Sequence, residues 1–378
     1  MKKIYLFGFT LLFQIFFCGI TFSQSIIYEP GNGLHLTSVQ NKWDFLFSGY
    51  INSIFAYHNI NQHNSIQNSF NVHRARIDLG FDYDKNYDLF FEFEAAGQRT
   101  EMVLAQIQVR LFDDNYIMAG KFINPFSAEN NCSTSRLTTI ERYSGLNSIF
   151  LLPGLDTQFG VMLFGSALNL NYYLSVTNGN GEAAQNIPEN NNKKEVTARV
   201  DYKTSKEFNF GAAVDYAGEQ LQTLSLVDHT FESFNNANIS GNHFGLLGNF
   251  EYENNPFLFR GEVFHYNFTN DLSSQNQTDG FLGGYLELGY FLTGNRQNGL
   301  QLIGRFETAR YGKKEINFLG PSVLNSYILG TNWLLHNMYS FQVNLIYEKA
   351  NSVSLIPNSR KTGKDSEFLF LTTLQLRF

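Results

Sequence analysis

The residues of this chain that could do chemistry are charged side chains placed at alternate positions. Basic residues recur on the polar phase of successive alternating segments between residues 70 and 123, and more charges follow in the longest connection between segments. Rings of charged side chains set ion selectivity when they line a pore. The candidate pore-lining and constriction residues are Arg74, Arg76, Arg110, Lys121, Arg136, Glu141 and Arg142.

Motifs for catalysis or for tight ligand binding do not accompany these charges. The chain contains no GxSxG, HExxH or P-loop pattern, and its 8 histidines are scattered, mostly in expected loops. Acidic pairs such as Asp113 and Asp114 fall in expected turns, where turn formation explains them. We therefore expect no enzyme, no cofactor and no metal site.

The elements that position the charges show a period of two from about residue 43, which is the strand period. In one segment Leu89, Phe91 and Phe93 share a face opposite Glu92 and Glu94. Most such segments have lengths that suit tilted, membrane-crossing strands of ~9–11 residues. Sixteen strands are predicted, near 43–57, 70–84, 87–97, 101–112, 114–123, 157–166, 168–178, 195–203, 206–216, 242–253, 256–268, 280–292, 299–310, 326–336, 338–348 and 366–378.

The connections between these strands alternate between short turns and long loops, with only the brief 97–101 connection breaking the rule. This alternation and an even strand number are typical of a transmembrane antiparallel β-barrel with both termini on the periplasmic side. The alternative is a soluble all-β protein, but one ordinary core could not bury sixteen apolar faces. Long loops are expected at 58–69, 124–156, 178–194, 217–241, 269–280, 311–325 and 349–365.

Three regions follow from these patterns. Residues 1–23 combine Lys2 and Lys3 with an apolar stretch, as in a cleaved secretory signal peptide. Residues 24–42 form an N-terminal lead-in segment, and residues 43–378 form the barrel. Without the signal peptide, Cys132 is the one remaining cysteine, which excludes an intramolecular disulfide. The net charge of −7 and the lack of basic blocks argue against nucleic acid as a partner.

The connection at about 124–156 is too apolar for a solvated loop. We expect it to fold into the lumen as a constriction loop, and the alternative is an external loop at a subunit contact. The basic strands near 70–123 would then face a wall richer in acids, which predicts an electric field across the lumen. Cross-strand ion pairs within the wall are the alternative explanation of the same charges. The acids of that wall are Asp201, Asp215, Glu251, Glu262, Glu287, Glu307 and Glu348.

Several short motifs resemble the phosphate-selective porin O and P family of sixteen-stranded outer-membrane channels. The resemblance implies a homotrimer, passive solute uptake and constriction roles for Lys121, Arg136 and Arg142. The end of the chain, with Leu374, Leu376 and Phe378, resembles the signal read by the barrel-insertion machinery. The motifs are NVHRARIDLGFD (71–82), GKFINPFSAE (120–129), ERYSG (141–145), SVTNGNG (175–181), ELGYFLTGN (287–295) and LTTLQLRF (371–378).

The expected function is therefore that of a bacterial outer-membrane porin, surrounded by outer-membrane lipid, through which small hydrophilic solutes or ions, including anions such as phosphate, diffuse passively. Acidic residues (34) outnumber lysines and arginines (27), which favours a general or mildly selective channel. The alternative is a non-conducting barrel that serves as a structural or ligand-binding protein of the outer membrane.

Overall fold

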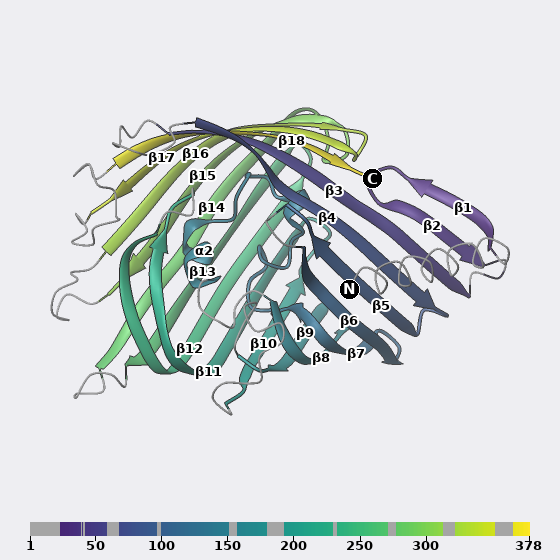
Figure 1. Ribbon diagram of the computed structural model, residues 1–378, viewed down its shortest axis with the longest axis horizontal. Coiled ribbons are helices and arrows are strands. Elements are labelled where there is room, and N and C mark those ends of the chain that lie inside the picture. Colours follow the sequence, from purple (N-terminus) through teal and green to yellow (C-terminus); the bar gives the residue numbers. More distant parts are fainter. Residues whose placement is uncertain are drawn as a thin grey trace, which may run out of the picture.

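A computed structural model describes residues 23–38, 40, 42–58, 68–96, 100–150, 157–179, 193–229, 233–270, 277–312, 322–351 and 366–378. Strands β3 to β18 form a closed antiparallel barrel (Figure 1). These strands are β3 (Trp43–His58), β4 (Asn68–Tyr83), β5 (Tyr87–Glu94), β6 (Glu101–Phe112), β7 (Asn115–Ile123), β8 (Thr157–Ala167), β9 (Leu170–Thr177), β10 (Glu195–Lys203), β11 (Phe208–Val227), β12 (Ser233–Asn254), β13 (Phe257–Asn270), β14 (Gln277–Gly294), β15 (Gly299–Tyr311), β16 (Ser322–Leu335), β17 (Tyr339–Ala350) and β18 (Ser366–Arg377).

The barrel closes where the last strand pairs with the first barrel strand. β18 runs antiparallel to β3, with Leu376 opposite Ile51, and each of the other strands pairs with its neighbours along the chain. Closure satisfies the backbone N–H and C=O groups without leaving a sheet edge in the bilayer. The predicted sixteen-stranded barrel is confirmed.

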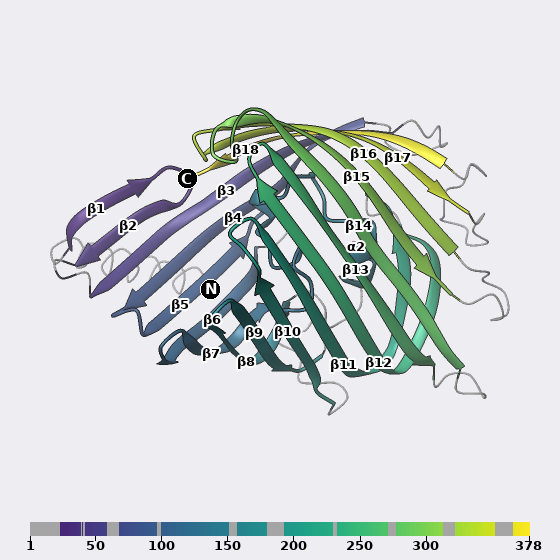
Figure 2. The same ribbon diagram turned by 180° about the vertical axis from the view of Figure 1, so that it is seen from behind.

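Two further strands lie in the expected lead-in segment. β1 (Ser23–Glu29) and β2 (Gly33–Ser38) form a hairpin around the left-handed glycines Gly31 and Gly33, whose φ angles are 74° and 112°. β2 pairs with the first residues of β3, beyond the point where β18 ends. The hairpin therefore extends the barrel wall at the short-turn end, next to the C-terminus (Figure 2). The predicted signal peptide, residues 1–23, lies outside the described residues except for Ser23.

The short turns match the prediction, and one expected loop does not. Asp84 with Lys85, and His336 with Asn337, have φ between 52° and 57°, as in the two-residue turns that join twisted strands. The loop expected at 217–241 was wrong, because β11 and β12 continue as a ladder as far as the pair Val227–Ser233. Asn and Ser fill this part of β12 and weaken the strand signal in the sequence.

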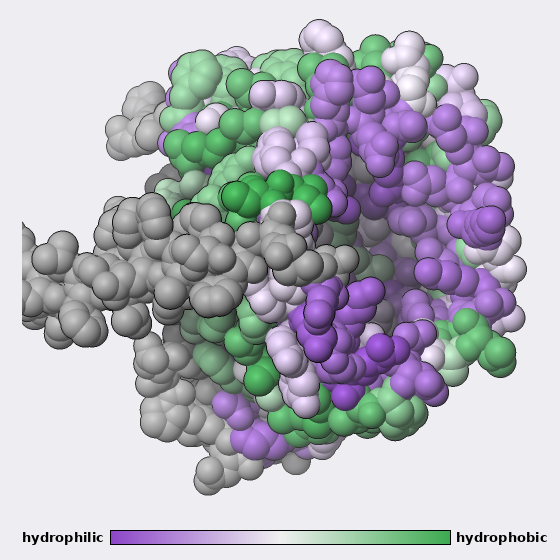
Figure 3. Space-filling model, turned by 90° about the vertical axis from the view of Figure 1, so that its right-hand side faces the viewer, coloured by the Kyte–Doolittle hydropathy of each residue, from purple (hydrophilic) through white to green (hydrophobic). Residues whose placement is uncertain are grey.

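The two faces of the wall differ as the alternation requires. In β17, Phe341 and Leu345 are exposed on the outside, whereas Gln342, Asn344 and Glu348 point inward and are buried. Seen from the short-turn end, hydrophilic residues surround a hollow and many hydrophobic residues lie on the outer side (Figure 3). Among the described residues, no helix has the length and apolar character needed to span a bilayer.

Replacing Leu329 by arginine tests which medium covers the outer face. Leu329 lies in the middle of β16 with 68% of its surface exposed. A base at the bilayer midplane costs about 2–4 kcal/mol, against about 0–1 kcal/mol near the interface. We expect Leu329→Arg to lower the free energy of unfolding in lipid vesicles by about 2–4 kcal/mol, the midplane value. The control, Tyr339→Arg at the edge of a turn, should lose much less, and equal losses would contradict a bilayer-facing surface.

Candidate functional site

Residues 124–150, called the inner loop below, run through the barrel interior. The inner loop contains η1 (Thr134–Arg136) and α2 (Ser144–Phe150), and α2 contacts β11, β14 and β15 (Figure 1). Apolar residues of the inner loop and of the wall form one buried cluster, which includes Phe126, Tyr143, Leu146, Ile149, Leu224, Phe264, Tyr266, Phe268 and Phe281. The inner loop thus fills the side of the lumen formed by these strands. Residues 151–156 of the expected constriction loop lie outside the described residues.

Two glycines allow the inner loop to approach the wall closely. A Cβ atom on Gly145, in α2, would lie 2.8 Å from the Cα of Gly283 in β14. A Cβ atom on Gly283 would lie 2.3 Å from the Phe264 ring. Side chains at either position would therefore push the helix away from the sheet.

A buried carboxylate of β13 holds the first part of the inner loop. Glu262 accepts hydrogen bonds from the Ser127 hydroxyl (2.6 Å), the Ala128 N–H (2.8 Å) and the Tyr143 hydroxyl (2.7 Å). Burial, followed by the nearby Glu262 charge, raises the pKa of Tyr143 well above its usual value. The phenol therefore stays protonated and keeps donating to the carboxylate.

Two more wall carboxylates hold the second part of the inner loop. Glu287, in β14, accepts a hydrogen bond from the Thr138 hydroxyl at 2.6 Å. Glu307, in β15, accepts one from the Ser144 N–H at 3.0 Å. Hydrogen bonds to a charged acceptor are about twice as strong as neutral ones. The acidic wall inferred from the sequence therefore binds the inner loop on these strands instead of facing open water.

Arg305 of β15 balances part of this negative charge. Its guanidinium lies 2.7 Å from Glu129 of the inner loop, 3.3 Å from Glu287 and 2.9 Å from Glu307, and it stacks 3.9 Å above the Tyr285 ring. A buried charge is tolerated only where it is paired and hydrogen-bonded. The wall and the inner loop thus share one charge network.

Glu141 bridges the inner loop to the opposite, basic wall. Its carboxylate lies 2.5 Å from His73 and 3.6 Å from Arg74, both on β4. Burial would raise the pKa of Glu141, but His73 and Arg74 outweigh it and lower the pKa. The structure therefore brings two of the predicted residues, Arg74 and Glu141, together as an ion pair.

Lys121 and Arg142 have structural partners. Lys121 is fully buried and donates to the Met102 carbonyl at 3.0 Å. The Arg142 guanidinium donates to carbonyls of the inner loop, at 3.2 Å for Asn130 and 3.0 Å for Cys132. Both cations therefore support the local fold, and their carbonyl contacts are set by tertiary structure that the sequence does not display.

The other predicted residues differ in position. Arg76 forms ion pairs with Glu92 and Glu94 on the neighbouring strand. Arg110 lies beside the short turn between β6 and β7, 3.6 Å from Asp114. Arg136 is exposed at the end of η1. The seven candidates therefore do not form one cluster.

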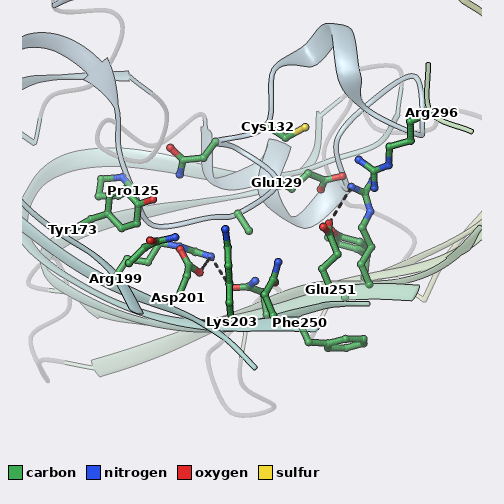
Figure 4. A pocket seen from close by; sticks show the side chains of 18 residues that line it. Pro125, Glu129, Cys132, Tyr173, Arg199, Asp201, Lys203, Phe250, Glu251 and Arg296 are labelled. Atoms are coloured by element: carbon green, nitrogen blue, oxygen red, sulfur yellow. Dashed lines mark hydrogen bonds and ion pairs between the residues drawn. The ribbon is translucent and has the colours of Figure 1, made fainter. Parts of the chain in front are cut away.

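Three clefts of about 470, 530 and 330 Å³ surround the inner loop at the short-turn end, and we call them together the vestibule. The first two share Asn131 and Cys132 in their lining, and the last two share Arg136 and Arg377. The first cleft has Arg199 with Asp201 on one side and Arg296 on the other (Figure 4). The vestibule is the hollow visible from this end (Figure 3).

Arg136 and Arg377 differ from most arginines of the vestibule. Arg136 donates to Asn32 (3.2 Å) and Arg377 to Asn337 (2.9 Å). Neither has an ion-pair partner among the described residues. The Nε atom of Arg377 is buried, and no described residue hydrogen-bonds to it. Two positive charges that form no ion pair among the described residues therefore face the same hollow.

Sequence reasoning missed the role of Arg377 and the contribution of the hairpin. Arg377 was not among the seven candidate residues, yet it lines the vestibule beside Arg136. Asn32 comes from the β1–β2 turn, which the lead-in assignment left without structure. The Pro-Gly-Asn-Gly sequence at 30–33 is a turn signal that could have indicated a hairpin.

Two groups of side chains in the described part of the chain have ligand atoms close enough to hold a metal ion. They are buried in the wall and do not line the vestibule clefts. The groups are Glu195, Asp215 and His243, and Asp228, Glu348 and Glu367.

The family comparison agrees with this architecture. The model of the phosphate-selective porin O and P family matches residues 49–378. The chain belongs to this family. It is an outer-membrane porin, located in the bacterial outer membrane, and its short-turn end faces the periplasm. No curated protein sequence matches the chain.

Solved structures share the fold of this porin at low sequence identity. OmpT of Vibrio cholerae, folded in vitro, has a TM-score of 0.65 at 10% identity, over 89% of this chain and 98% of that chain. An anion-selective porin from Comamonas acidovorans has a TM-score of 0.64 at 12% identity, over 89% and 100%. Salmonella typhi OmpF has a TM-score of 0.59 at 10% identity, over 94% and 100%. These similarities concern the fold alone.

The pair formed by His229 and Glu307 predicts a pH dependence. His229 follows β11 and lies 2.8 Å from Glu307, the carboxylate that also binds Ser144. Burial would lower the pKa of His229, but Glu307 and then Glu348 raise it to about 9. Because this pKa is higher than in the unfolded chain, the pair stabilises the fold fully below about pH 6.5 and loses its contribution as the pH rises through about 9.

We expect the porin to lose about 1.5–3 kcal/mol of unfolding free energy between pH 6 and pH 9.5 from this pair. Denaturant unfolding in lipid vesicles at the two pH values measures the loss. His229→Gln should reduce the pH dependence, and His265→Gln, at an outward position of β13, should leave it unchanged. An unaltered pH dependence in His229→Gln would rule out the pair as its source.

Proposed function

We propose that this porin allows passive diffusion of small hydrophilic solutes and ions, with a preference for anions such as phosphate. The observation that carries the proposal is the pair of vestibule arginines, Arg136 and Arg377, which lack an ion-pair partner among the described residues. Arginine suits phosphate because its fork of N–H groups matches the oxygens of the anion. The neighbouring carboxylates Asp78 and Glu92 limit the preference to a mild one.

The proposed path runs between the inner loop and the basic wall. The 530 Å³ cleft is lined by residues of β3 to β7 on one side and by residues 131–136 of the inner loop on the other. On this path Arg76 and Arg136 contact the solute, and Arg74 sets the charge of the wall nearby. Glu141 and Arg142 keep the inner loop in place, Lys121 ties β7 to β6, and Arg110 lies outside the constriction.

The assembly and insertion of this porin also enter the proposal. A solved structure of Vibrio cholerae OmpT is a trimer, and we infer a homotrimer here. Leu374 and Leu376 are exposed on the outer face of β18, and the Phe378 ring lies 5.6 Å from that of Phe47. These three C-terminal residues are the inferred signal for the barrel-insertion machinery. The channel is inferred to be non-enzymatic, since the site's contacts hold the loop and the wall together.

A second candidate function is a non-conducting barrel that serves as a structural or ligand-binding protein. The buried apolar cluster between the inner loop and β11 to β15 favours it, because this packing closes part of the lumen. Single-channel recording in planar bilayers separates the two functions. Large ohmic steps support the porin with an open path, and silence supports the closed barrel.

Reversing the charge of Arg136 tests the anion preference. Arg136→Glu replaces an attractive charge on the path by a repulsive one, worth about 1 kcal/mol after screening. We expect the chloride-to-potassium permeability ratio to fall about fivefold, measured as the reversal potential in a KCl gradient. Arg110→Glu, beside the short turn between β6 and β7, is the matched control and should leave the ratio unchanged. Equal ratios for Arg136→Glu and the wild type would exclude Arg136 from the path.

Modification of Cys132 tests whether the vestibule lies on the conducting path. Cys132 is the free cysteine of the described residues, it is half-buried and it lines two of the clefts. Burial raises the pKa of its thiol, so a charged methanethiosulfonate reagent should react faster at pH 9 than at pH 7. We expect single-channel conductance to drop by about half or more after modification, and Cys132→Ser to be insensitive. Full modification without a change in conductance would place the path elsewhere.

A further inference from the structure

Three consecutive strands bring metal-ligating side chains together on the inner face of the wall. Glu195 of β10, Asp215 of β11 and His243 of β12 are buried, and their ligand atoms all lie within 4.8 Å of one another. His243 Nε2 and Asp215 Oδ2 are 2.8 Å apart. A tetrahedral zinc site needs ligand atoms about 3.4 Å apart. Small side-chain adjustments would therefore complete such a site.

Neutral groups orient the two carboxylates. Glu195 accepts hydrogen bonds from Asn124 on one oxygen (2.7 Å) and from Gln158 on the other (3.0 Å). Asp215 accepts one from the Thr197 hydroxyl at 2.5 Å. Outer hydrogen bonds of this kind fix ligand orientation in protein metal sites.

Buried hydroxyl groups beside the carboxylates provide a second, independent observation. Thr177 lies directly opposite Glu195 in the β9–β10 ladder, and Ser175 lies opposite Thr197. Thr177 Oγ1 and Ser175 Oγ are buried and have no hydrogen-bond partner within the described part of the chain. Buried polar atoms without a partner are rare in folded proteins and call for an explanation such as an ion or its bound water. Because residues opposite each other share a face, these hydroxyls lie on the inward face with Glu195 and Thr197.

We propose that Glu195, Asp215 and His243 bind a divalent transition-metal ion, with Zn²⁺ as the best match. One imidazole nitrogen and two carboxylate oxygens form a mixed ligand set that suits zinc. The metal replaces the proton shared between His243 and Asp215, and Thr177 and Ser175 accept hydrogen bonds from its bound water. No sequence motif indicated this site, because its ligands lie on three separate strands.

The site is coupled to the inner loop through Asn124, the first residue of that loop. A metal ion that fixes Glu195 also fixes the amide that Asn124 donates to it. Metal binding therefore holds the base of the inner loop against β10. This role is structural and does not depend on which solutes pass through the porin.

Zn²⁺ titration of the full-length, detergent-folded porin by calorimetry tests the proposal. We expect one Zn²⁺ per chain in the wild type, at least tenfold weaker binding in Glu195→Gln and His243→Gln, and unchanged binding in His265→Gln, a control on the outward face of β13. Circular dichroism checks that each variant keeps its strands. Equal affinity in the wild type and His243→Gln, or binding without a defined stoichiometry, would overturn the proposal in favour of surface binding.

Substitution by Co²⁺ keeps the test decisive if a variant fails to fold. Wild-type porin loaded with one equivalent of Co²⁺ should show the visible absorption of a four- or five-coordinate nitrogen and oxygen site, and Zn²⁺ should displace it. A spectrum identical to that of hydrated Co²⁺ would overturn the proposal without any variant.

Discussion

Buried carboxylates on the inner wall are the constraint on which the interior of this porin depends. Glu262, Glu287 and Glu307 cannot face an apolar environment alone, and the inner loop supplies their hydroxyl and N–H donors. Arg305 balances part of their charge and joins the wall to Glu129. The position of the inner loop is therefore set by charge compensation as much as by apolar packing, and the shape of the vestibule follows from it.

The outer surface is constrained by one factor, its contact with the hydrocarbon of the bilayer. Hydrocarbon accepts no hydrogen bonds, so the strands must pair with each other all the way around and show only apolar side chains at the midplane. The same alternation then directs every second residue into the lumen. On the proposed path, a paired arginine such as Arg76 therefore offers less net charge to a solute than Arg136 does.

The strands and short turns could be predicted from the sequence because they depend on local signals: a period of two and turn residues at its interruptions. The partners of the charged residues could not be predicted this way. Glu262 meets Ser127, and Arg305 meets Glu129, across more than 100 residues of chain, and no local pattern marks such pairs. The β11–β12 extension was missed because Asn and Ser carry little strand signal. The β1–β2 hairpin was missed because its strands are short and β2 pairs only with the first residues of β3.

The seam between β3 and β18 has a consequence for biogenesis. Ile51 and Leu376 come from opposite ends of the chain, so this contact has the highest loop-closure cost in the barrel and forms slowly. Until the C-terminal strand arrives, the sheet has two unpaired edges, which attract other chains. Closure of the β3–β18 seam therefore removes the edges through which an incomplete barrel could pair with other chains.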